Sequence, residues 1–257
     1  MIQIAKKLFF RARKEAIQSI INKEGYGIEI GPSFRPLAPK KEGYKVTIVD
    51  HCQKKELLLK YAHLGNIVLQ IEEVDVVISG IGSFDRIEDN KYDWIIASHV
   101  LEHIPNLLGF LKEMFKKLSP GGQLILILPN KDFTFDTERE NSSLSKVLQH
   151  FEEDLTNHKE SDIVEYFLAV VDRKKELLRP WKLFSSKTPM HTMQEMENAI
   201  AMRRKGNYID IHAWVFTLRS LKKIFDGLSK LKAFEFEVRK CERFFGTEIL
   251  CILERKI

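Results

Sequence analysis

The fold is decided by residues 92–130, which read YDWIIASHVLEHIPNLLGFLKEMFKKLSPGGQLILILPN. Trp94 to Ala97 form a short apolar run typical of a buried strand, and apolar residues from Leu107 to Leu118 recur at helical spacing. Pro120-Gly121-Gly122 is expected to end that helix before a second apolar run, Leu124 to Leu128. Two strands without polar alternation around a helix predict a βαβ unit in a parallel sheet that is buried on both faces.

Polar side chains gather where these two strands end. Ser98, His99 and Glu102 follow the first strand, and Asn130 and Asp132 follow the second. Ligands of parallel sheets bind outside the carboxyl ends of the strands. The sequence therefore predicts one binding rim.

At this point the chain resembles a known family. The run SHVLEHIPN, the LSPGG turn and the strand that ends in Pro129-Asn130 are similar to the central and fifth-strand region of class I S-adenosylmethionine-dependent methyltransferases. The resemblance implies an α/β fold with a Rossmann-like, seven-stranded sheet, mostly parallel with one antiparallel strand. It also implies S-adenosylmethionine as the methyl donor and S-adenosylhomocysteine as the product.

The upstream residues carry the predicted cofactor contacts. Gly27 to Gly31 has an acid near its end and a glycine at the turn, and an acid about 20 residues further on, at a strand tip, can accept hydrogen bonds from ribose hydroxyls. The resemblance places Glu29 and Gly31 at the methionine end, Asp50 on the ribose and His51 beside the adenine. A third strand, Val74 to Ile78, would present the next residues to the adenine. The whole predicted set is Glu29, Gly31, Pro32, Arg35, Asp50, His51, Ser79, Gly80, Ile81, Ser98 and His99.

The glycine turn departs from the family pattern. Pro32-Ser33-Phe34-Arg35 stands where further glycines are usual, and Pro36 and Pro39 disfavour a full helix after the turn. Pyrophosphate needs a helix N-terminus, whereas Arg35 or loop amides can bind a carboxylate, so this loop favours a methyltransferase over a nicotinamide-dependent oxidoreductase. Ser79 stands where many members have an acid. These departures leave open a catalytically inactive binding subunit.

The chain divides into four predicted regions. Residues 1–24 form a basic amphipathic helix, 25–130 the cofactor-binding core, 131–211 a helical insertion after strand 5, and 212–257 the completion of the sheet. The helix is expected to pack over the sheet or to pair subunits in a homodimer; a peripheral membrane contact is the alternative. A long insertion that leaves from a strand's carboxyl end is a candidate substrate lid.

Charge is unevenly distributed along the insertion. Acids dominate from residue 151 to 172, and bases dominate from 173 to 205. Either the two segments pair as solvated helix faces, or some of the bases bind an anionic acceptor, because arginine forks match phosphate geometry.

The end of the insertion narrows the functional setting. The stretch Asp210-x-His212-x-Trp214-x-Phe216-Thr217 resembles a methyltransferase subgroup of bacterial surface-polysaccharide (capsule or lipopolysaccharide) and glycosyltransferase gene clusters. The resemblance implies a small acceptor, such as a sugar nucleotide or glycan intermediate, carbohydrate-derived or phosphorylated. We expect O-methylation, with N-methylation of a similar acceptor as the alternative.

A hydroxyl acceptor must lose its proton, and histidine, with a pKa of about 6.5, is the commonest group that accepts one. The candidate bases are His99 and His212, although His212 is equally well read as a buried structural residue. Asp210 or Asp132 would orient or replace the base, and His191 is a weaker candidate. We interpret Glu102 and His103 as capping the entry of the following helix.

Composition limits the remaining possibilities. A net charge of +5 with scattered aromatic residues does not favour nucleic acid. The three cysteines are odd in number and lack metal-ligand spacing, which predicts a reducing compartment and no metal. No apolar stretch reaches the roughly 20 residues of a membrane span, so we expect a cytoplasmic protein.

Overall fold

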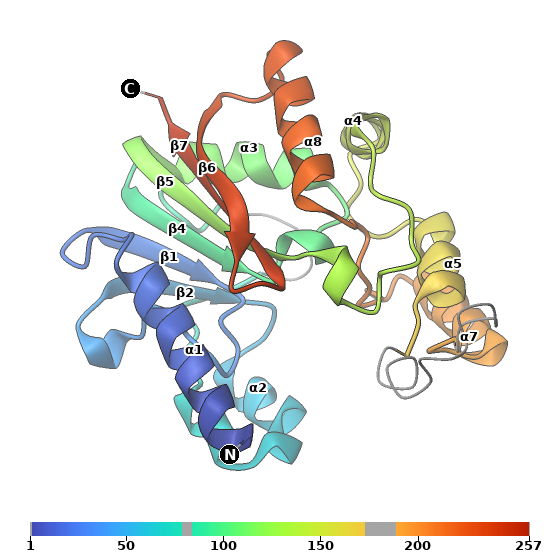
Figure 1. Ribbon diagram of the computed structural model, residues 1–257, viewed down its shortest axis with the longest axis horizontal. Coiled ribbons are helices and arrows are strands. Elements are labelled where there is room, and N and C mark those ends of the chain that lie inside the picture. The colour runs from blue at the N-terminus through green and yellow to red at the C-terminus, as the bar shows by residue number, and fades with distance from the viewer. Residues whose placement is uncertain (1, 79–83, 173–188, 257) are drawn as a thin grey trace.

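The computed structural model describes residues 2–78, 84–172 and 189–256, built around one seven-stranded sheet (Figure 1). The strand order is β3-β2-β1-β4-β5-β7-β6. β7 runs antiparallel to both of its neighbours, and the other neighbouring strands pair in parallel. The strands are β1 (Tyr26–Ile30), β2 (Lys45–Asp50), β3 (Val76–Val77), β4 (Tyr92–Ser98), β5 (Leu118–Pro129), β6 (Phe236–Phe244) and β7 (Glu248–Arg255). The predicted sheet, mostly parallel with one antiparallel strand, is confirmed.

The middle of the sheet is apolar on both faces, as the unbroken apolar runs predicted. Along β4, Trp94 and Ile96 belong to the core on one face, and Ile95 and Ala97 belong to the core on the other. All four are at most 1% exposed. Each large apolar side chain buried in this way contributes about 1.5–3 kcal/mol, so this strand anchors both layers of the fold.

Helices cover both faces of the sheet (Figure 1). The core on one face includes residues of α1 (Ile2–Gln18) and α2 (Lys54–Lys60). The core on the other includes residues of α3 (Leu107–Lys117), α4 (Leu144–Glu152) and α8 (Leu218–Lys230). Shorter 3₁₀ segments are η1 (Lys40–Glu42), η2 (Ala62–Gln70), η3 (Leu101–His103) and η4 (Lys131–Phe133).

The first helix is shorter than predicted, and the apolar residues that pack on the core lie at and beyond its second half. α1 ends at Gln18, and its buried apolar residue is Ile17, whereas Leu8 is 60% exposed. Arg13, expected on the solvated face, is buried because it pairs with a strand residue described below. Packing over the sheet therefore holds for the second half of the helix. A membrane contact or a subunit pairing through the first half stays a prediction, and among the helices described, none is long and apolar enough to span a bilayer.

Pro120-Gly121-Gly122 lies inside β5 and does not end α3, although the sequence predicted that it would. α3 already ends at Lys117, and β5 runs through Pro120, Gly121 and Gly122. Gly121 has φ +80°, and a Cβ on Gly122 would lie 2.8 Å from the carbonyl oxygen of Tyr92. The glycines therefore allow β4 and β5 to approach each other closely.

The third strand is shorter than the predicted Val74 to Ile78, because only Val76 and Val77 pair with β2.

The insertion is helical, as predicted, and has a small core of its own. Its further helices are α5 (Glu160–Ala169) and α7 (Met193–Arg204). Ile163 and Ala199 pack together between them, and Arg204 makes a two-bond ion pair with Glu160 at 2.8 Å. This pair agrees with the interpretation in which the acidic and basic segments face each other at the solvent-exposed surface of the helices. The bases from 173 to 187 lie outside the described residues, and the domain division with its lid stays a prediction.

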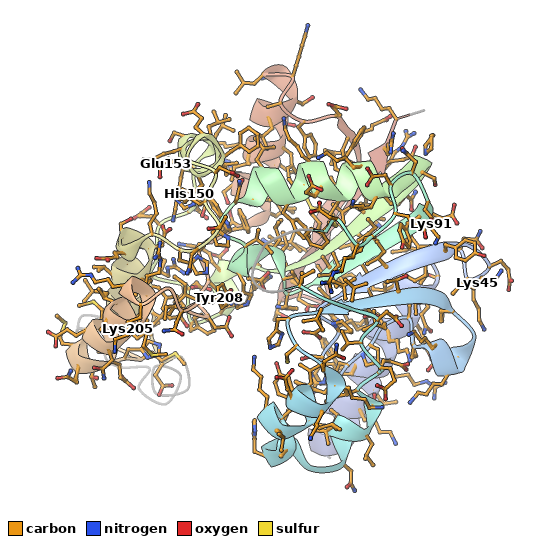
Figure 2. All side chains as sticks on the ribbon, turned by 180° about the vertical axis from the view of Figure 1, so that it is seen from behind. Lys45, Lys91, His150, Glu153, Lys205 and Tyr208 are labelled. Atoms are coloured by element: carbon orange, nitrogen blue, oxygen red, sulfur yellow. A yellow bond between two sulfur atoms is a disulfide. The ribbon has the colours of Figure 1, made fainter. Side chains whose placement is uncertain are left out.

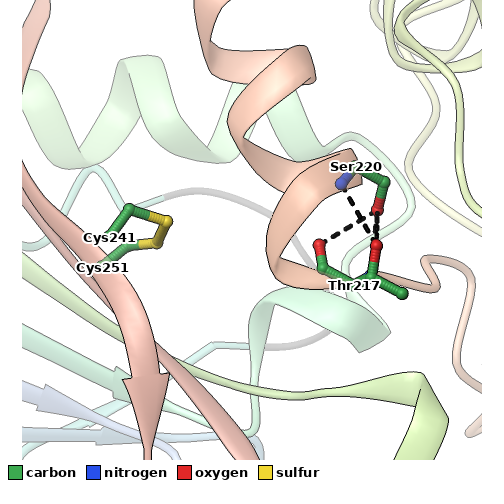
Figure 3. The surroundings of a disulfide bond; sticks show 4 residues. All are labelled: Thr217, Ser220, Cys241 and Cys251. Atoms are coloured by element: carbon green, nitrogen blue, oxygen red, sulfur yellow. Dashed lines mark hydrogen bonds between the residues drawn. A yellow bond between two sulfur atoms is a disulfide. The ribbon is translucent and has the colours of Figure 1, made fainter.

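Two of the three cysteines face each other across the last two strands. Cys241 on β6 is the register partner of Cys251 on β7, and a disulfide joins them (Figure 3). Figure 3 also shows Thr217 and Ser220, whose mutual hydrogen bonds cap the start of α8. The odd cysteine count suggested a reducing compartment, but whether two cysteines pair depends on strand register, which a count of residues does not reveal. The cysteines thus give no support for a reducing compartment.

Candidate active site

A cavity of about 420 Å³ opens at the carboxyl ends of β1, β2 and β4, where the sequence predicted a binding rim. A second hollow of about 540 Å³ adjoins it and shares Gly31, Ser33, Tyr61 and His99. The first cavity contains the predicted cofactor residues Gly31, Asp50, His51 and His99; the second contains Glu29, Gly31, Pro32, Arg35, Ser98 and His99. Ser79, Gly80 and Ile81 lie outside the described residues. The rest of the predicted set thus comes together at one rim.

Asp50 stands at the tip of β2 with its carboxylate fixed in place. One oxygen accepts hydrogen bonds from the amide of His51 at 2.8 Å and contacts its Nδ1 at 2.6 Å. The other accepts from the amide of Ser33 at 3.3 Å, which ties β2 to the glycine turn after β1. Asp50 lines the cavity, so its remaining lone pairs are placed to accept from a ligand hydroxyl.

Glu29 holds the loop that follows β1. Its two oxygens accept hydrogen bonds from the amides of Leu37 at 2.7 Å and Ala38 at 3.0 Å. Burial raises the pKa of Glu29 to about 7, against the opposing effect of these amides. Both oxygens of Glu29 therefore already bind the loop. The predicted contact between Glu29 and the methionine end of the cofactor stays a prediction.

Gly31 supplies the turn that this loop needs. Its φ is +61°, and a Cβ there would lie 3.0 Å from Cγ2 of Val100. An L-residue other than glycine costs about 1–2 kcal/mol in this conformation, so the close approach of the loop to the end of β4 depends on glycine.

Arg35 places a cation on the wall of the second hollow. Its guanidinium lies 3.7 Å from the ring centroid of Phe10. Burial and the nearby charge of Arg13 lower the pKa of Arg35. No carboxylate among the described residues pairs with it, so its charge is available to a ligand.

His99 is held between two carboxylates. Its Nε2 lies 2.6 Å from Oε1 of Glu248, and its Nδ1 lies 3.3 Å from Oε1 of Glu102. Burial alone would lower the pKa of His99, but Glu102 and Glu248 outweigh it and raise the pKa to about 9. The ring is therefore a cation near neutral pH, and His99 is a poor proton acceptor.

The partner of His99 reaches back to the first helix. Arg13 donates to both oxygens of Glu248 at 2.8 and 2.9 Å, and also to Oγ of Ser98 at 2.8 Å. Burial alone would raise the pKa of Glu248, but His99 and Arg13 outweigh it and lower the pKa. Neither Arg13 nor Glu248 was predicted, because the contact joins residues from the two ends of the chain.

His212 is not among the residues that line the cavity, but its ring centroid lies 4.7 Å from the ring centroid of His103, which does line it. Its Nδ1 is 2.6 Å from Oδ2 of Asp136, and Asp136 is itself bound by Arg139 at 2.8 Å. Burial alone would raise the pKa of Asp136, but His212 and Arg139 outweigh it and lower the pKa. A buried, structurally held histidine, the alternative open from the sequence, therefore fits His212 better than a base in contact with the acceptor.

His103 and Asp210 occupy the wall where a base was expected. His103 Nδ1 lies 2.9 Å from Oδ1 of Asp210, and both residues line the cavity. Glu102 and Asp210 raise the pKa of His103 against the effect of burial. His103 in turn lowers the pKa of Asp210 to about 2. Tyr208, where the insertion returns to the core, donates to the carbonyl of His103 at 3.1 Å (Figure 2).

The interpretation of Glu102 and His103 as helix caps is wrong. α3 begins at Leu107, and its cap is Asn106, whose side chain accepts from the amide of Gly109 at 2.8 Å. Glu102 is instead fully buried beside three histidines, and these outweigh burial and lower its pKa.

The remaining predicted alternatives lie elsewhere. Asp132 lines a separate hollow with Thr217 and Arg243, and His191 packs against Phe167 in the insertion. Lys60 and Tyr61, which no sequence motif singles out, line the first cavity from the end of α2.

A model of the family described as "Methyltransferase domain" matches residues 4–228. The chain belongs to this methyltransferase domain family. The chain is therefore an enzyme of the methyltransferase class, and the match decides against the oxidoreductase alternative. A search of the curated proteins finds no match.

Solved structures are similar to this methyltransferase at low sequence identity. A putative S-adenosylmethionine-dependent methyltransferase from Listeria monocytogenes is 12% identical, with a TM-score of 0.50 over 96% of this chain and 98% of that one. A 1,6-didemethyltoxoflavin-N1-methyltransferase from Burkholderia thailandensis, solved with S-adenosylhomocysteine, is 11% identical, with a TM-score of 0.49 over 97% and 79%. A possible histamine N-methyltransferase from Thermotoga maritima is 14% identical, with a TM-score of 0.47 over 99% and 96%. At 12% identity, the likeness to the Listeria monocytogenes structure supports the fold alone.

The polar groups at the rim of the methyltransferase fit S-adenosylmethionine. Asp50 offers a fixed carboxylate to ribose hydroxyls, the glycine at 31 allows the loop to approach closely, and Arg35 offers a cation for a carboxylate. When bound, the cofactor supplies a methyl group on a sulfonium for in-line displacement. The assignment of these residues to its parts stays a prediction.

Proposed function

We propose that this methyltransferase transfers the methyl group of S-adenosylmethionine to a hydroxyl of a small, anionic, carbohydrate-derived acceptor. The single observation that carries the anionic character is Lys60. Its Nζ lies 3.3 Å from Nε2 of His51 on the cavity wall, and no carboxylate among the described residues forms an ion pair with it. An unpaired ammonium in a cavity is a natural anchor for phosphate.

The position of Lys60 supports an acceptor under the returning insertion. Lys60 and Asp210 line the same cavity. Asp50 and the glycine turn line the same cavity, where the cofactor is proposed to bind, and His51 lies between Asp50 and Lys60. The acceptor would then lie among Lys60, Tyr208 and His103, which all line this cavity.

The surface-polysaccharide setting rests on the resemblance of residues 210–217 to that subgroup. A sugar nucleotide or glycan intermediate has both a hydroxyl to methylate and a phosphate for Lys60 to bind. A cytoplasmic location agrees with such substrates and stays a prediction.

Two alternatives keep specific support. An amine acceptor needs no base, which suits a cavity wall where His99 and His103 both have a raised pKa. A binding subunit without catalysis is supported by the proline-containing loop after Gly31.

A transfer assay tests the proposal. Purified protein is incubated with cofactor carrying a labelled methyl group and with paired sugars, one phosphorylated or nucleotide-linked and one neutral. We expect label only in the charged members, as a methyl ether identified by mass spectrometry. Label only in amines would establish the N-methyl alternative, and retained cofactor binding without any transfer would support the binding subunit.

A further inference from the structure

Three potential metal ligands meet beside the cavity. Glu102 and His103 lie on η3, and His212 lies on the segment that returns from the insertion. One ligand atom from each residue lies within 4.8 Å of the other two. The carbonyl of Glu102 accepts hydrogen bonds from the amides of Ala213 at 2.8 Å and Trp214 at 3.2 Å. The backbone therefore holds the two segments together independently of these side chains.

The carboxylate of Glu102 is buried, and its one close partner, His99, does not meet it in hydrogen-bond geometry. The residue is fully buried, and neither oxygen accepts a hydrogen bond from the described residues. Its closest ionic contact is Nδ1 of His99 at 3.3 Å. Because an unsatisfied polar group in a protein interior costs several kcal/mol, a site that keeps one is suited to a cation.

A carboxylate fixes the ring of His212 from behind, as is common for histidines that bind a metal. Asp136 lies 2.6 Å from its Nδ1, which leaves Nε2 as the nitrogen available to the cluster. Arg139 fixes Asp136 at 2.8 Å and donates to the carbonyl of His212, also at 2.8 Å. A carboxylate behind an imidazole is the common outer partner of a ligating histidine, because it fixes the ring and raises its basicity.

We propose that Glu102, His103 and His212 bind one divalent transition-metal ion of the Zn²⁺ or Mn²⁺ type. Two imidazoles and one carboxylate suit these ions, and they leave open positions for a further ligand. Bonds of about 2.0–2.2 Å would bring the ligand atoms to about 3–4 Å from one another, which requires movements of about 1 Å. The sequence predicted no metal because these ligands come from segments far apart in the chain and show no spacing motif.

The ion would face the acceptor, since His103 lines the cavity. This step rests on the proposed function. An ion lowers the pKa of a hydroxyl bound to it, so the acceptor proton passes to solvent while the new C–O bond forms and the bond from sulfur to the methyl carbon breaks, releasing S-adenosylhomocysteine.

Metal titration tests the site without cofactor or acceptor. Protein freed of metal with EDTA is titrated with Co²⁺, followed by visible absorption, and with Zn²⁺, followed by calorimetry. We expect one ion per chain, and at least a tenfold loss of affinity in Glu102→Gln and in His212→Ala. His63→Ala, which removes an exposed histidine on η2, should bind as the wild type does.

Two outcomes would overturn the proposal: no saturable binding by the folded wild type, or equal affinity in the wild type and both ligand variants. The wild-type titration decides even where a variant fails to fold. A parallel titration with S-adenosylhomocysteine separates this test from the proposed function, because cofactor binding can fail while metal binding succeeds.

Discussion

Nε2 of His99 lies 2.6 Å from Oε1 of Glu248, and this contact joins the tip of β4 to the start of β7. Arg13 binds the same carboxylate from α1, so three separate elements meet at one charged group. His99 also has φ +55°, a backbone conformation that non-glycine residues seldom adopt. The structure thus holds a strained, charged histidine at the junction of the two hollows.

Removing the charge of Glu248 should lower the pKa of His99. In Glu248→Gln the ring keeps Glu102 but loses its closest anion, so the pKa should fall from about 9 toward its ordinary value. Imidazole NMR shifts recorded against pH in EDTA measure this directly. Glu242→Gln, on the exposed side of β6, is the matched control and should leave the titration of His99 unchanged. An unchanged pKa in Glu248→Gln would contradict the ion-pair account.

The same pair predicts how stability depends on pH. The folded-state pKa of His99 is raised to about 9, above an unfolded value of about 6.5, so its contribution is fully present below about pH 6.5 and is lost as pH rises through about 9. Urea denaturation at pH 6.5 and pH 9.5, with EDTA present, should show a smaller decline in His99→Gln than in the wild type. Equal declines would mean that this histidine is not held charged in the fold.

Lys60 should matter for the acceptor and not for the cofactor. Lys60→Ala should raise KM for a phosphorylated acceptor roughly tenfold or more, because a charge-assisted hydrogen bond contributes about 1.5–3 kcal/mol. Affinity for S-adenosylhomocysteine should change little. Lys55→Ala, an exposed lysine on the same helix, provides the comparison. A parallel loss of cofactor affinity in Lys60→Ala would assign Lys60 to the cofactor instead.

Gly27 should be intolerant of any side chain. A Cβ at this position would lie 2.1 Å from Cζ2 of Trp94, which is 1% exposed and fixed in the core. Overpacking of this kind typically costs about 1–3 kcal/mol, so Gly27→Ala should lower the free energy of unfolding by at least that amount. Chemical denaturation measures the change. A variant as stable as the wild type would show that the ring of Trp94 can move aside.

The parallel, buried middle of the sheet was predictable because unbroken apolar runs and strand-end polar residues are local signals. Asp50 and Ser98 lie at the same rim because the parallel strands β2 and β4 have their carboxyl ends at the same edge of the sheet, as predicted. The length of β3 was not predictable, since a two-residue strand carries too few residues to show a pattern.

The chemistry of the rim was less predictable, because it depends on contacts between distant segments. Glu248 sets the charge of His99, and Asp136 sets the orientation of His212, yet neither residue has a local motif. Arg13 looked like one of several solvated bases until its partner on β7 was known. Glu102 looked like a helix cap because the sequence does not show where α3 begins.

The central claim is that the rim between Gly31 and Asp50 binds S-adenosylmethionine. Calorimetric titration of the wild type with S-adenosylhomocysteine tests it most directly, with Asp50→Ala beside it and Asp226→Ala, an exposed aspartate on α8, as control. The account predicts one molecule bound per chain, at least a tenfold weaker affinity in Asp50→Ala, and no change in Asp226→Ala. No binding by the folded wild type at concentrations up to about 1 mM, an affinity worth only about 4 kcal/mol, would contradict it.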